Sequence, residues 1–182
     1  MADPTETFYG LAADPGNVNA LKRLIALKGR ARGKAIPLIA ADMKSVRELV
    51  RGRISPLGMR LIMAFWPGPL TLIFHASEAV PELITGKGRG VGIRISDYPL
   101  CKRLLKATGF PLTSTSANPA GFSPARDALE AREYFNRSID LIIDGGTAPG
   151  GLASTVVDVR EDKPLILREG GIRTFDILQA AQ

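Results

Sequence analysis

Apolar residues recur with a helical period in several stretches, and most of these stretches begin or end at a residue that caps helices. Asn17 precedes apolar positions spaced three and four apart, and Gly29 follows them, which predicts a helix between the two. Ser55 followed by Pro56 starts another helix, which Pro67 ends. The other predicted helices span residues 42–50, 80–85, 100–107, 124–135 and 175–180.

Short apolar and β-branched runs between these helices predict strands. The clearest runs span residues 35–40, 70–75, 91–95, 141–143, 154–159 and 165–167. Helices and strands interleave, but two tight strand-to-strand connections come late, so we expect a mixed sheet rather than a purely parallel one. The sequence has no repeat, low-complexity tract or linker, so residues 1–182 are expected to form a single α/β domain with flanking helices.

The stretch 111–121, PLTSTSANPAG, combines a further strand with a polar turn. Small polar side chains gather where the strand breaks, at Ser114, Thr115, Ser116 and Asn118. In open α/β sheets ligands bind at such strand ends. A serine- and threonine-rich turn whose hydroxyls bond only their own backbone would have the same composition. Both interpretations stay open for this stretch alone.

The composition narrows the classes of function. The formal net charge of +6 and the pI of about 9.8 favour polyanionic partners such as nucleotides or RNA, or simply a basic surface. Cys101 is the only cysteine and His75 the only histidine, which excludes an internal disulfide and a Cys/His metal cluster. We interpret His75 as a strand residue. No apolar run is long enough for a membrane span and no signal peptide opens the sequence, so we expect a cytoplasmic protein.

The candidate chemistry rests on cations and hydroxyls at the ends of predicted elements. The sequence contains no Ser/His/Asp set, no Walker A motif and no dinucleotide fingerprint. The candidate residues are Thr5, Thr7, Lys28, Arg30, Arg94, Ser114, Ser116, Asn118, Ser154 and Arg168. Arg94 alternates with two isoleucines, so it should face the opposite side of its strand, toward an anion or solvent. Such groups suit phosphoryl or nucleotidyl transfer, or equally a passive anion site.

Eight short motifs extend the argument when they are taken in order. They are PTETFYGL at 4–11, KGR at 28–30, WPGPLT at 66–71, VGIR at 91–94, SAN at 116–118, DGG at 144–146, STVVD at 154–158 and LREG at 167–170. Through these motifs the chain resembles the YrdC-like family, whose enzymatic members are threonylcarbamoyl-AMP synthases. The family's hallmark is a Lys-x-Arg pair facing a Ser-x-Asn pair, which this sequence matches with Lys28/Arg30 and Ser116/Asn118.

The resemblance implies a twisted open α/β sheet with a basic concave cleft, and a nucleotidyltransferase. The implied reaction converts L-threonine, bicarbonate and ATP, with Mg²⁺ accompanying the ATP, into threonylcarbamoyl-AMP and pyrophosphate. The product then feeds the threonylcarbamoylation of an adenosine in tRNA, carried out by partner proteins. By the same resemblance, the catalytic residues are Lys28, Arg30, Ser116 and Asn118. The threonine-binding residues are Thr5, Thr7, Arg94, Ser114 and Ser154, and the nucleotide side is lined by Lys28, Arg30, Ser116, Asn118, Pro124 and Arg168.

Two departures from the family pattern and two alternatives accompany this prediction. Ala41 stands where many members carry a histidine, so a threonine contact is missing there. Only three residues precede Pro4, where members usually have a helix and a strand, so we expect the Thr5–Thr7 loop to be poorly held. The alternative function is a non-catalytic module that binds double-stranded RNA or tRNA through the basic cleft. A relative that has lost synthase activity is disfavoured, since such relatives tend to lose the Ser-x-Asn pair.

Overall fold

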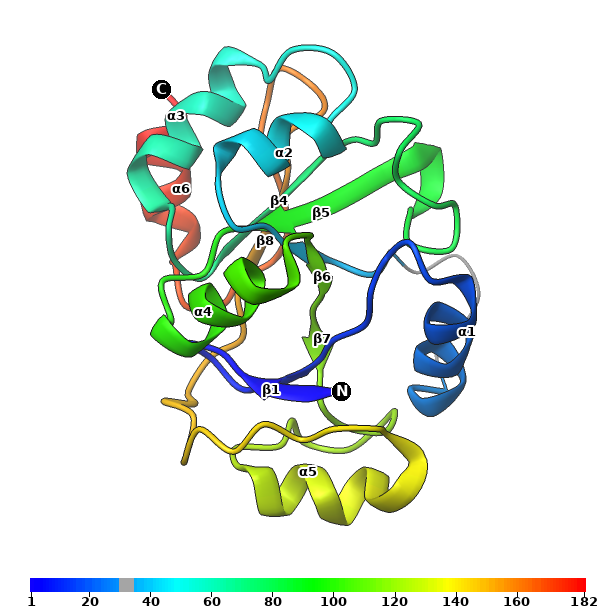
Figure 1. The fold of residues 1–182 in the computed structure, drawn as a ribbon. Coiled ribbons are helices and arrows are strands. Elements are labelled where there is room, and N and C mark those ends of the chain that lie inside the picture. Colours follow the sequence, from blue (N-terminus) through cyan, green and yellow to red (C-terminus); the bar gives the residue numbers. More distant parts are fainter. Residues whose placement is uncertain (30–34) are drawn as a thin grey trace.

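The strands form two sheets in the computed structural model, which describes residues 1–29 and 35–182 (Figure 1). The larger sheet has the order β6 (Leu112–Thr113), β3 (Leu38–Ile39), β5 (Gly90–Arg94), β4 (Leu70–His75), β8 (Thr155–Asp158) and β9 (Leu165–Arg168). The smaller sheet has the order β1 (Ala2–Pro4), β2 (Tyr9–Leu11) and β7 (Thr115–Ser116). In the larger sheet β3 is parallel to β5 and β4 to β8, while the other pairs are antiparallel, so the predicted mixed α/β fold is confirmed.

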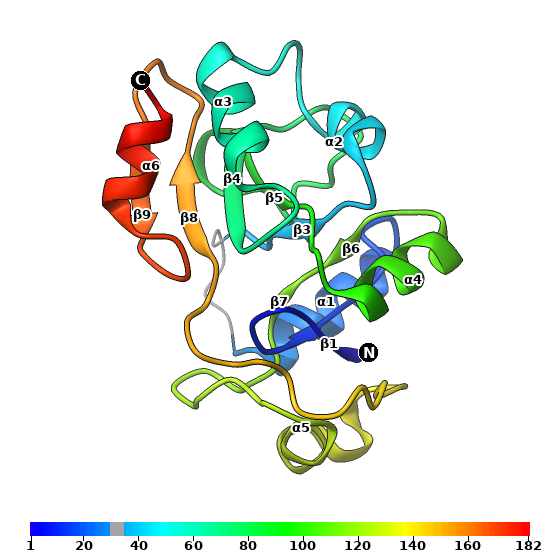
Figure 2. The ribbon, with the colours of Figure 1, turned by 90° about the vertical axis from the view of Figure 1, so that its left-hand side faces the viewer.

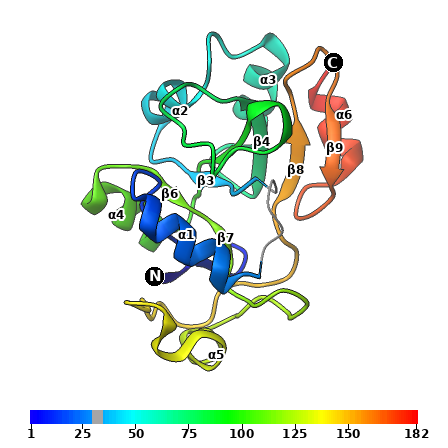
Figure 3. The same ribbon diagram turned by 90° about the vertical axis from the view of Figure 1, so that its right-hand side faces the viewer.

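The helices divide between the two sheets. They are α1 (Val18–Leu27), α2 (Met43–Leu49), α3 (Pro56–Phe65), α4 (Pro99–Thr108), α5 (Ala128–Phe135) and α6 (Thr174–Ala180), with short 3₁₀ turns at Lys87–Arg89 and Asn136–Ser138. Figures 2 and 3 show α2, α3 and α6 beside the larger sheet, and α1, α4 and α5 around the smaller one. Asn17 and Ser55 accept backbone N–H groups as the caps of α1 and α3, as predicted.

Alternation along β4 and β5 gives the larger sheet two different faces. Leu72 and Phe74 of β4 and Ile93 of β5 join the main hydrophobic core, which also contains the apolar sides of α2, α3 and α6. Thr71 of β4 and Arg94 of β5 therefore point to the other face. The predicted orientation of Arg94 is confirmed, and one face of the sheet is free to carry polar groups.

The stretch 111–121 crosses from one sheet to the other. Its first strand, β6, pairs with β3, whereas its second, β7, pairs with β2. Ser114 lies at the crossing, where its backbone N–H donates to the carbonyl of Pro37 at 2.8 Å. The single strand predicted here is thus two short strands, and the chain joins the two sheets at its polar residues.

Three predicted elements differ from the structure in type or in extent. Residues 80–85 form successive turns, with Ile84 N–H bonded to Pro81 and Thr85 N–H bonded to Glu82, because six residues ahead of Gly86 are too few for a stable helix. Residues 35–40 contain a strand only at Leu38–Ile39. Helix α5 begins at Ala128 rather than at Pro124.

The late start of α5 has a clear cause in Ala125. Its N–H donates to the carbonyl of Ala117 at 3.0 Å, and its carbonyl accepts the N–H of Tyr9 at 2.9 Å. A residue that bonds an extended neighbour on each side cannot also lie in a helix. Asp127 then caps α5 by accepting the N–H of Glu130.

The strand predicted at 141–143 is reduced to one bridge, between Ile142 and Ala2 of β1. Ala2 N–H donates to the carbonyl of Leu141, and Ile143 N–H donates to the carbonyl of Ala2, both at 2.9 Å. The next bond of a parallel ladder would need an N–H at Pro4, which has none. The pairing therefore stops after Ile143. Leu141, at the other end of the bridge, is 52% exposed.

The Thr5–Thr7 loop is well held, contrary to expectation. Strand β1 leads directly into it and pairs with β2 along its whole length. Within the loop, Thr5 N–H donates to the carbonyl of Phe8 at 3.2 Å, and Gly150 N–H donates to the carbonyl of Thr7 at 2.7 Å. The loop is thus anchored both by its own turn and by the segment that follows residue 146.

Candidate functional site

A cavity of about 360 Å³ lies where the two sheets meet. Residues from both sheets line it, including Thr71 and Ile73 of β4, Gly92 and Arg94 of β5, and Ser116 of β7. The predicted site residues that line it are Thr5, Thr7, Lys28, Arg94, Ser114, Ser116, Pro124, Ser154 and Arg168. Asn118 is buried and does not line the cavity, and Arg30 lies outside the described residues. Ala41 is exposed and also lies outside the lining.

Lys28 connects the end of α1 to the turn after β7. It follows the last residue of the helix, and Gly29 beyond it adopts a positive φ of 54° that a side chain would disfavour. The ammonium donates to the carbonyls of Ser116 and Asn118, both at 2.7 Å, and to Asn118 Oδ1 at 2.9 Å. Ser116 Oγ accepts at 3.3 Å. Although only 7% of Lys28 is exposed, its charge is surrounded by oxygen acceptors at the cavity wall.

Asn118 completes this arrangement from behind. Its amide Nδ2 donates to the carbonyl of Phe122 at 2.6 Å and to that of Pro119 at 3.1 Å, so its Oδ1 is aimed at Lys28. The Ser-x-Asn motif therefore presents one hydroxyl to the cavity, at Ser116, and one buried amide to the lysine. Among the described residues, the Asn118 side chain meets the site through Lys28, and its backbone N–H donates to the carbonyl of Ser116 at 3.0 Å.

The two threonines of the β1–β2 loop lie side by side at another wall. Their Oγ1 atoms are 3.1 Å apart, and Thr5 Oγ1 also donates to the carbonyl of Phe8 at 2.8 Å. Thr7 N–H donates to Thr5 Oγ1 at 3.3 Å. The spacing of two residues thus brings the two hydroxyls together in the lining of the cavity.

The DGG turn supports this loop. The Tyr9 hydroxyl donates to the carbonyl of Gly146 at 2.8 Å and accepts the N–H of Gly145 at 3.1 Å. A Cβ at residue 145 would lie 2.7 Å from Cγ of Pro4, which only glycine avoids. The motif therefore acts on the threonine loop through close packing.

Arg94 is held by Glu6, a residue that the sequence reasoning missed. Its Nη1 donates to Glu6 Oε1 at 2.5 Å, and its Nη2 is 3.4 Å from Ser114 Oγ. The second carboxylate oxygen of Glu6 accepts a short hydrogen bond from Ser96 Oγ. The sequence did hold a signal for Glu6. An arginine within a strand needs an anionic partner, and Glu6 is the one carboxylate within the PTET motif.

Ser154 and Arg168 form the opposite wall with Thr71, which the sequence reasoning also missed. Ser154 Oγ lies 3.0 Å from Thr71 Oγ1, and the guanidinium of Arg168 donates to the carbonyl of Ser154 at 2.7 and 3.1 Å. A Cβ at residue 170 would overlap the carbonyl oxygen of Ala153, so the LREG motif needs a glycine for this close approach. Partial burial, and then the like charge of Arg94, lower the pKa of Arg168.

The resulting cavity is positively charged and rich in donors. Lys28, Arg94 and Arg168 line it, while Glu6 lies behind Arg94 and does not. Such a site binds carboxylates and phosphates and offsets negative charge that develops during a reaction. Among residues 1–29 and 35–182, no group of three or more His, Cys, Asp or Glu side chains could hold a metal ion.

A buried acidic group lies close to this site without entering it. Asp3 is 4% exposed, and burial raises its pKa to about 7, although the N-terminal ammonium and Arg94 both favour its charged form. Burial likewise raises the pKa of the Cys101 thiol to about 12. Neither residue lines the cavity.

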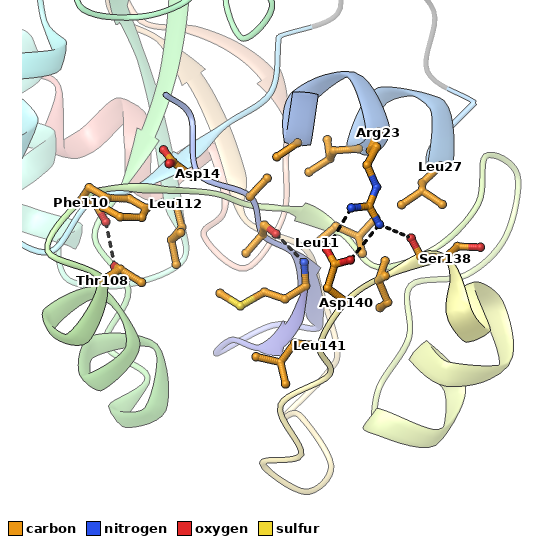
Figure 4. A pocket seen from close by; sticks show the side chains of 16 residues that line it. Leu11, Asp14, Arg23, Leu27, Thr108, Phe110, Leu112, Ser138, Asp140 and Leu141 are labelled. Atoms are coloured by element: carbon orange, nitrogen blue, oxygen red, sulfur yellow. Dashed lines mark hydrogen bonds and ion pairs between the residues drawn. The ribbon is translucent and has the colours of Figure 1, made fainter. Parts of the chain in front are cut away.

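A second groove, mainly apolar, lies on the other side of the small sheet (Figure 4). Leu24 and Leu27 of α1, Leu112 and Leu141 contribute to its lining. Arg23 crosses its rim to pair with Asp140 at 3.0 Å. None of the described site residues predicted from the sequence lies here, so we place the candidate site in the cavity between the sheets.

Comparisons with known proteins show what the chain is similar to. A family model described as "Telomere recombination" (Sua5, YciO and YrdC) matches residues 1–170. A threonylcarbamoyl-AMP synthase of Marinobacter nauticus is 38% identical over 163 residues, which cover 87% of this chain and 84% of the relative. Among residues 1–29 and 35–182, none of the helices has the length and apolar character that a membrane span requires.

Two solved structures have the same fold and are more than 25% identical in sequence to this chain. A crystal structure of Pyrococcus abyssi Sua5 complexed with L-threonine matches with a TM-score of 0.93 and 36% identity over 98% of this chain. The chain spans 52% of that protein, about half its length. The crystal structure of E. coli YciO matches with a TM-score of 0.88 and 27% identity, covering 97% of this chain and 85% of that one.

Proposed function

Because the chain belongs to the Sua5/YciO/YrdC family, we propose that it forms threonylcarbamoyl-AMP and pyrophosphate from L-threonine, bicarbonate and ATP. The observation that carries the proposal is the cavity itself. Among the described residues, it gathers hydroxyls and three cations from seven separate segments, and a Sua5 relative with the same fold was crystallised with L-threonine. In this proposal the protein is a nucleotidyltransferase.

Threonine would occupy the part of the cavity lined by Thr5, Thr7, Arg94, Ser114 and Ser154. The guanidinium of Arg94 suits the substrate carboxylate, because arginine presents several N–H donors in one plane. The paired hydroxyls of Thr5 and Thr7 suit the polar side chain and amino group of the amino acid. These roles rest on the family resemblance and on the shared cavity.

The nucleotide would occupy the side lined by Lys28, Ser116, Pro124 and Arg168, with Arg30 assigned to it from the sequence alone. Asn118 would act as a positioning residue that fixes Lys28. Mg²⁺ would enter bound to the phosphates of ATP. The described part of the chain supplies cations and hydroxyls here rather than a carboxylate cage.

The reaction then needs orientation and charge stabilisation rather than a protein nucleophile. The amino group of threonine and bicarbonate would form a carbamate with loss of water. A carbamate oxygen would attack the α-phosphorus of ATP, and the bond to the bridging oxygen of the β-phosphate would break as pyrophosphate leaves. Lys28 and Arg168 would offset the charge that gathers on the phosphates.

We also propose which macromolecules the protein works with. The product would pass to proteins that transfer the threonylcarbamoyl group to an adenosine of tRNA, and the net charge of +6 is compatible with contact to tRNA or double-stranded RNA. We place this activity in the cytoplasm.

Pyrophosphate release tests the proposal directly. Wild-type protein is incubated with MgATP alone, with L-threonine or bicarbonate added singly, and with both. We expect release only when both are present. Equal release in all four mixtures would contradict the proposal.

A pair of asparagine variants links that activity to the cavity. Asn118→Ala removes the amide that fixes Lys28, and we expect turnover to fall by about 100-fold while circular dichroism stays unchanged. Asn19→Ala, at an exposed position of α1, serves as the matched control and should retain full turnover. Full activity of Asn118→Ala would remove Asn118 from the working site.

A further inference from the structure

The geometry points to Glu6 as a positioning residue that holds Arg94 in the orientation needed to bind the carboxylate of threonine. The inference rests on the proposed function and deepens it, since it names what prepares the carboxylate subsite. Glu6 does not line the cavity, so it would act through Arg94 and not by touching the substrate.

The contact between the two side chains is close and shielded. Arg94 Nη1 lies 2.5 Å from Glu6 Oε1, and the two side chains are only 7% and 11% exposed. A charge-assisted hydrogen bond shielded in this way is stronger than an exposed ion pair. Arginine otherwise has several rotatable bonds, so a fixed partner removes much of the conformational freedom that ligand binding would have to restrict.

Glu6 is itself fixed from the side away from the cavity. Ser96, which is 2% exposed, donates its hydroxyl to Glu6 Oε2 and accepts the N–H of Tyr98 at 3.2 Å. Tyr98 directly precedes the first residue of α4. A chain of hydrogen bonds therefore runs from the start of α4 through Ser96 and Glu6 to Arg94.

The arrangement leaves a second nitrogen of Arg94 toward the cavity. Nη2 lies near Ser114 Oγ, at 3.4 Å, and both residues line the cavity. Glu6 occupies Nη1, and its other oxygen is committed to Ser96. A substrate carboxylate can therefore approach Nη2 without displacing Glu6.

Charge supports the same role. Arg168 lines the cavity close enough to Arg94 for the two like charges to disfavour each other. The carboxylate of Glu6 offsets this repulsion and keeps Arg94 in place when no ligand is bound. Without it, we expect the guanidinium of Arg94 to turn away from Arg168.

Steady-state kinetics with three variants test the inference. Glu6→Ala should raise KM for threonine about 10-fold or more, and leave KM for ATP and kcat within about threefold. Glu6→Gln keeps an oxygen acceptor for Arg94 and should restore most of the threonine KM. The matched control is Asp158→Ala, which removes a carboxylate that is 12% exposed and paired with Arg160 at 2.6 Å, outside the cavity. It should leave KM for threonine unchanged.

Two results would overturn the inference. An unchanged KM for threonine in folded Glu6→Ala would show that Arg94 needs no such support, and a lowered KM would show that Glu6 competes with the substrate. If Glu6→Ala does not fold, Ser96→Ala takes its place. Ser96→Ala removes the hydrogen bond to Glu6 Oε2 and also the acceptor of the Tyr98 N–H. The threonine KM should rise about threefold, and an unchanged KM would overturn the inference.

Calorimetry with L-threonine alone separates this inference from the proposed function. If wild-type protein releases no pyrophosphate, the proposed function fails. The role of Glu6 then stands if Glu6→Ala binds threonine about 10-fold more weakly than wild type. Wild-type protein that binds no threonine would overturn both.

Discussion

Lys28 and Asn118 are 90 positions apart in the sequence, and two hydrogen bonds join them in the fold. The Lys28 ammonium reaches the backbone carbonyl of Asn118 at 2.7 Å and its side-chain oxygen at 2.9 Å. The lysine therefore connects α1 to the turn after β7 as well as charging the cavity wall. A single residue of the Lys-x-Arg motif thus has both a structural and an electrostatic role.

Replacing this lysine should lower stability as well as activity. Lys28→Met keeps most of the side chain's apolar volume but leaves the oxygens of Ser116 and Asn118 without their donor. We expect the free energy of unfolding to fall by about 2–4 kcal/mol, because buried acceptors lose their partner. Urea denaturation measures this, with Lys22→Met, exposed on the same helix, as control. Equal stability of the two variants would contradict the prediction.

The Thr71 hydroxyl should matter for threonine binding more than for folding. Thr71→Val keeps the shape of the side chain and removes the contact at 3.0 Å to Ser154 Oγ. We expect KM for threonine to rise about 3- to 10-fold, and the free energy of unfolding to change by about 1 kcal/mol. The control is Thr108→Val on α4, whose hydroxyl bonds the carbonyl of Leu105 away from the cavity. A similar KM in both variants would argue against a role for Thr71.

Asp3 should make stability depend on pH. Its pKa is raised from 3.8 to about 7 in the folded protein, so between these values the folded state holds a proton that the unfolded state has released. The free energy of unfolding therefore falls as pH rises from about 4 to about 7, by up to about 4 kcal/mol from this group, and then levels off. Urea denaturation at pH 4 and pH 8 measures the effect.

The variant Asp3→Asn isolates the contribution of that carboxyl group. It imitates the protonated form, so it should match wild type at pH 4 and exceed its stability at pH 8. Asp162→Asn, at an exposed position, should follow wild type at both values. A constant difference between wild type and Asp3→Asn across this range would contradict the prediction.

Cys101 should be unreactive in the folded protein. It is 2% exposed, and burial raises its pKa to about 12, so little thiolate is present at pH 8. We expect a thiol reagent to react about 100-fold more slowly with native protein than with protein in guanidinium chloride. Because the chain has one cysteine, the reaction rate of the thiol reagent, followed by its change in absorbance, reports on Cys101 alone. Equal rates in the two conditions would show that the thiol is accessible.

Local chemistry made much of the fold predictable. Asn17 and Ser55 cap their helices, Gly109 ends α4 in the left-handed region, and β4 spans the predicted residues 70–75. Each of these features depends on a few neighbouring residues. The alternation that placed Arg94 opposite Ile93 is equally local.

Elements that depend on distant partners could not be predicted in this way. The division of residues 111–121 between two sheets is determined by β3 and β2, which lie far away in the sequence. The loss of the strand at 141–143 depends on the missing N–H of Pro4, more than 130 residues earlier in the chain. The hydrophobic pattern of a segment does not indicate which distant strand or residue it will pair with.

The same limit applies to the site. The cations and hydroxyls at element ends were predictable, because their residue types indicate anion binding. Thr71 was missed because threonine in an apolar strand looks like a β-branched strand former. Glu6 was missed because a carboxylate is unexpected in an anion site until Arg94 is known to lie beside it.

The crossing of the chain between the two sheets separates folding from recognition within one short segment. Thr113 and Ala117 are buried outside the cavity lining, while Ser114 and Ser116, which lie between them in the sequence, line the cavity. A substitution at 114 or 116 therefore alters the wall that meets the ligand and leaves the packing of both sheets in place. The residues that meet a ligand here are therefore separate from those that build the hydrophobic core.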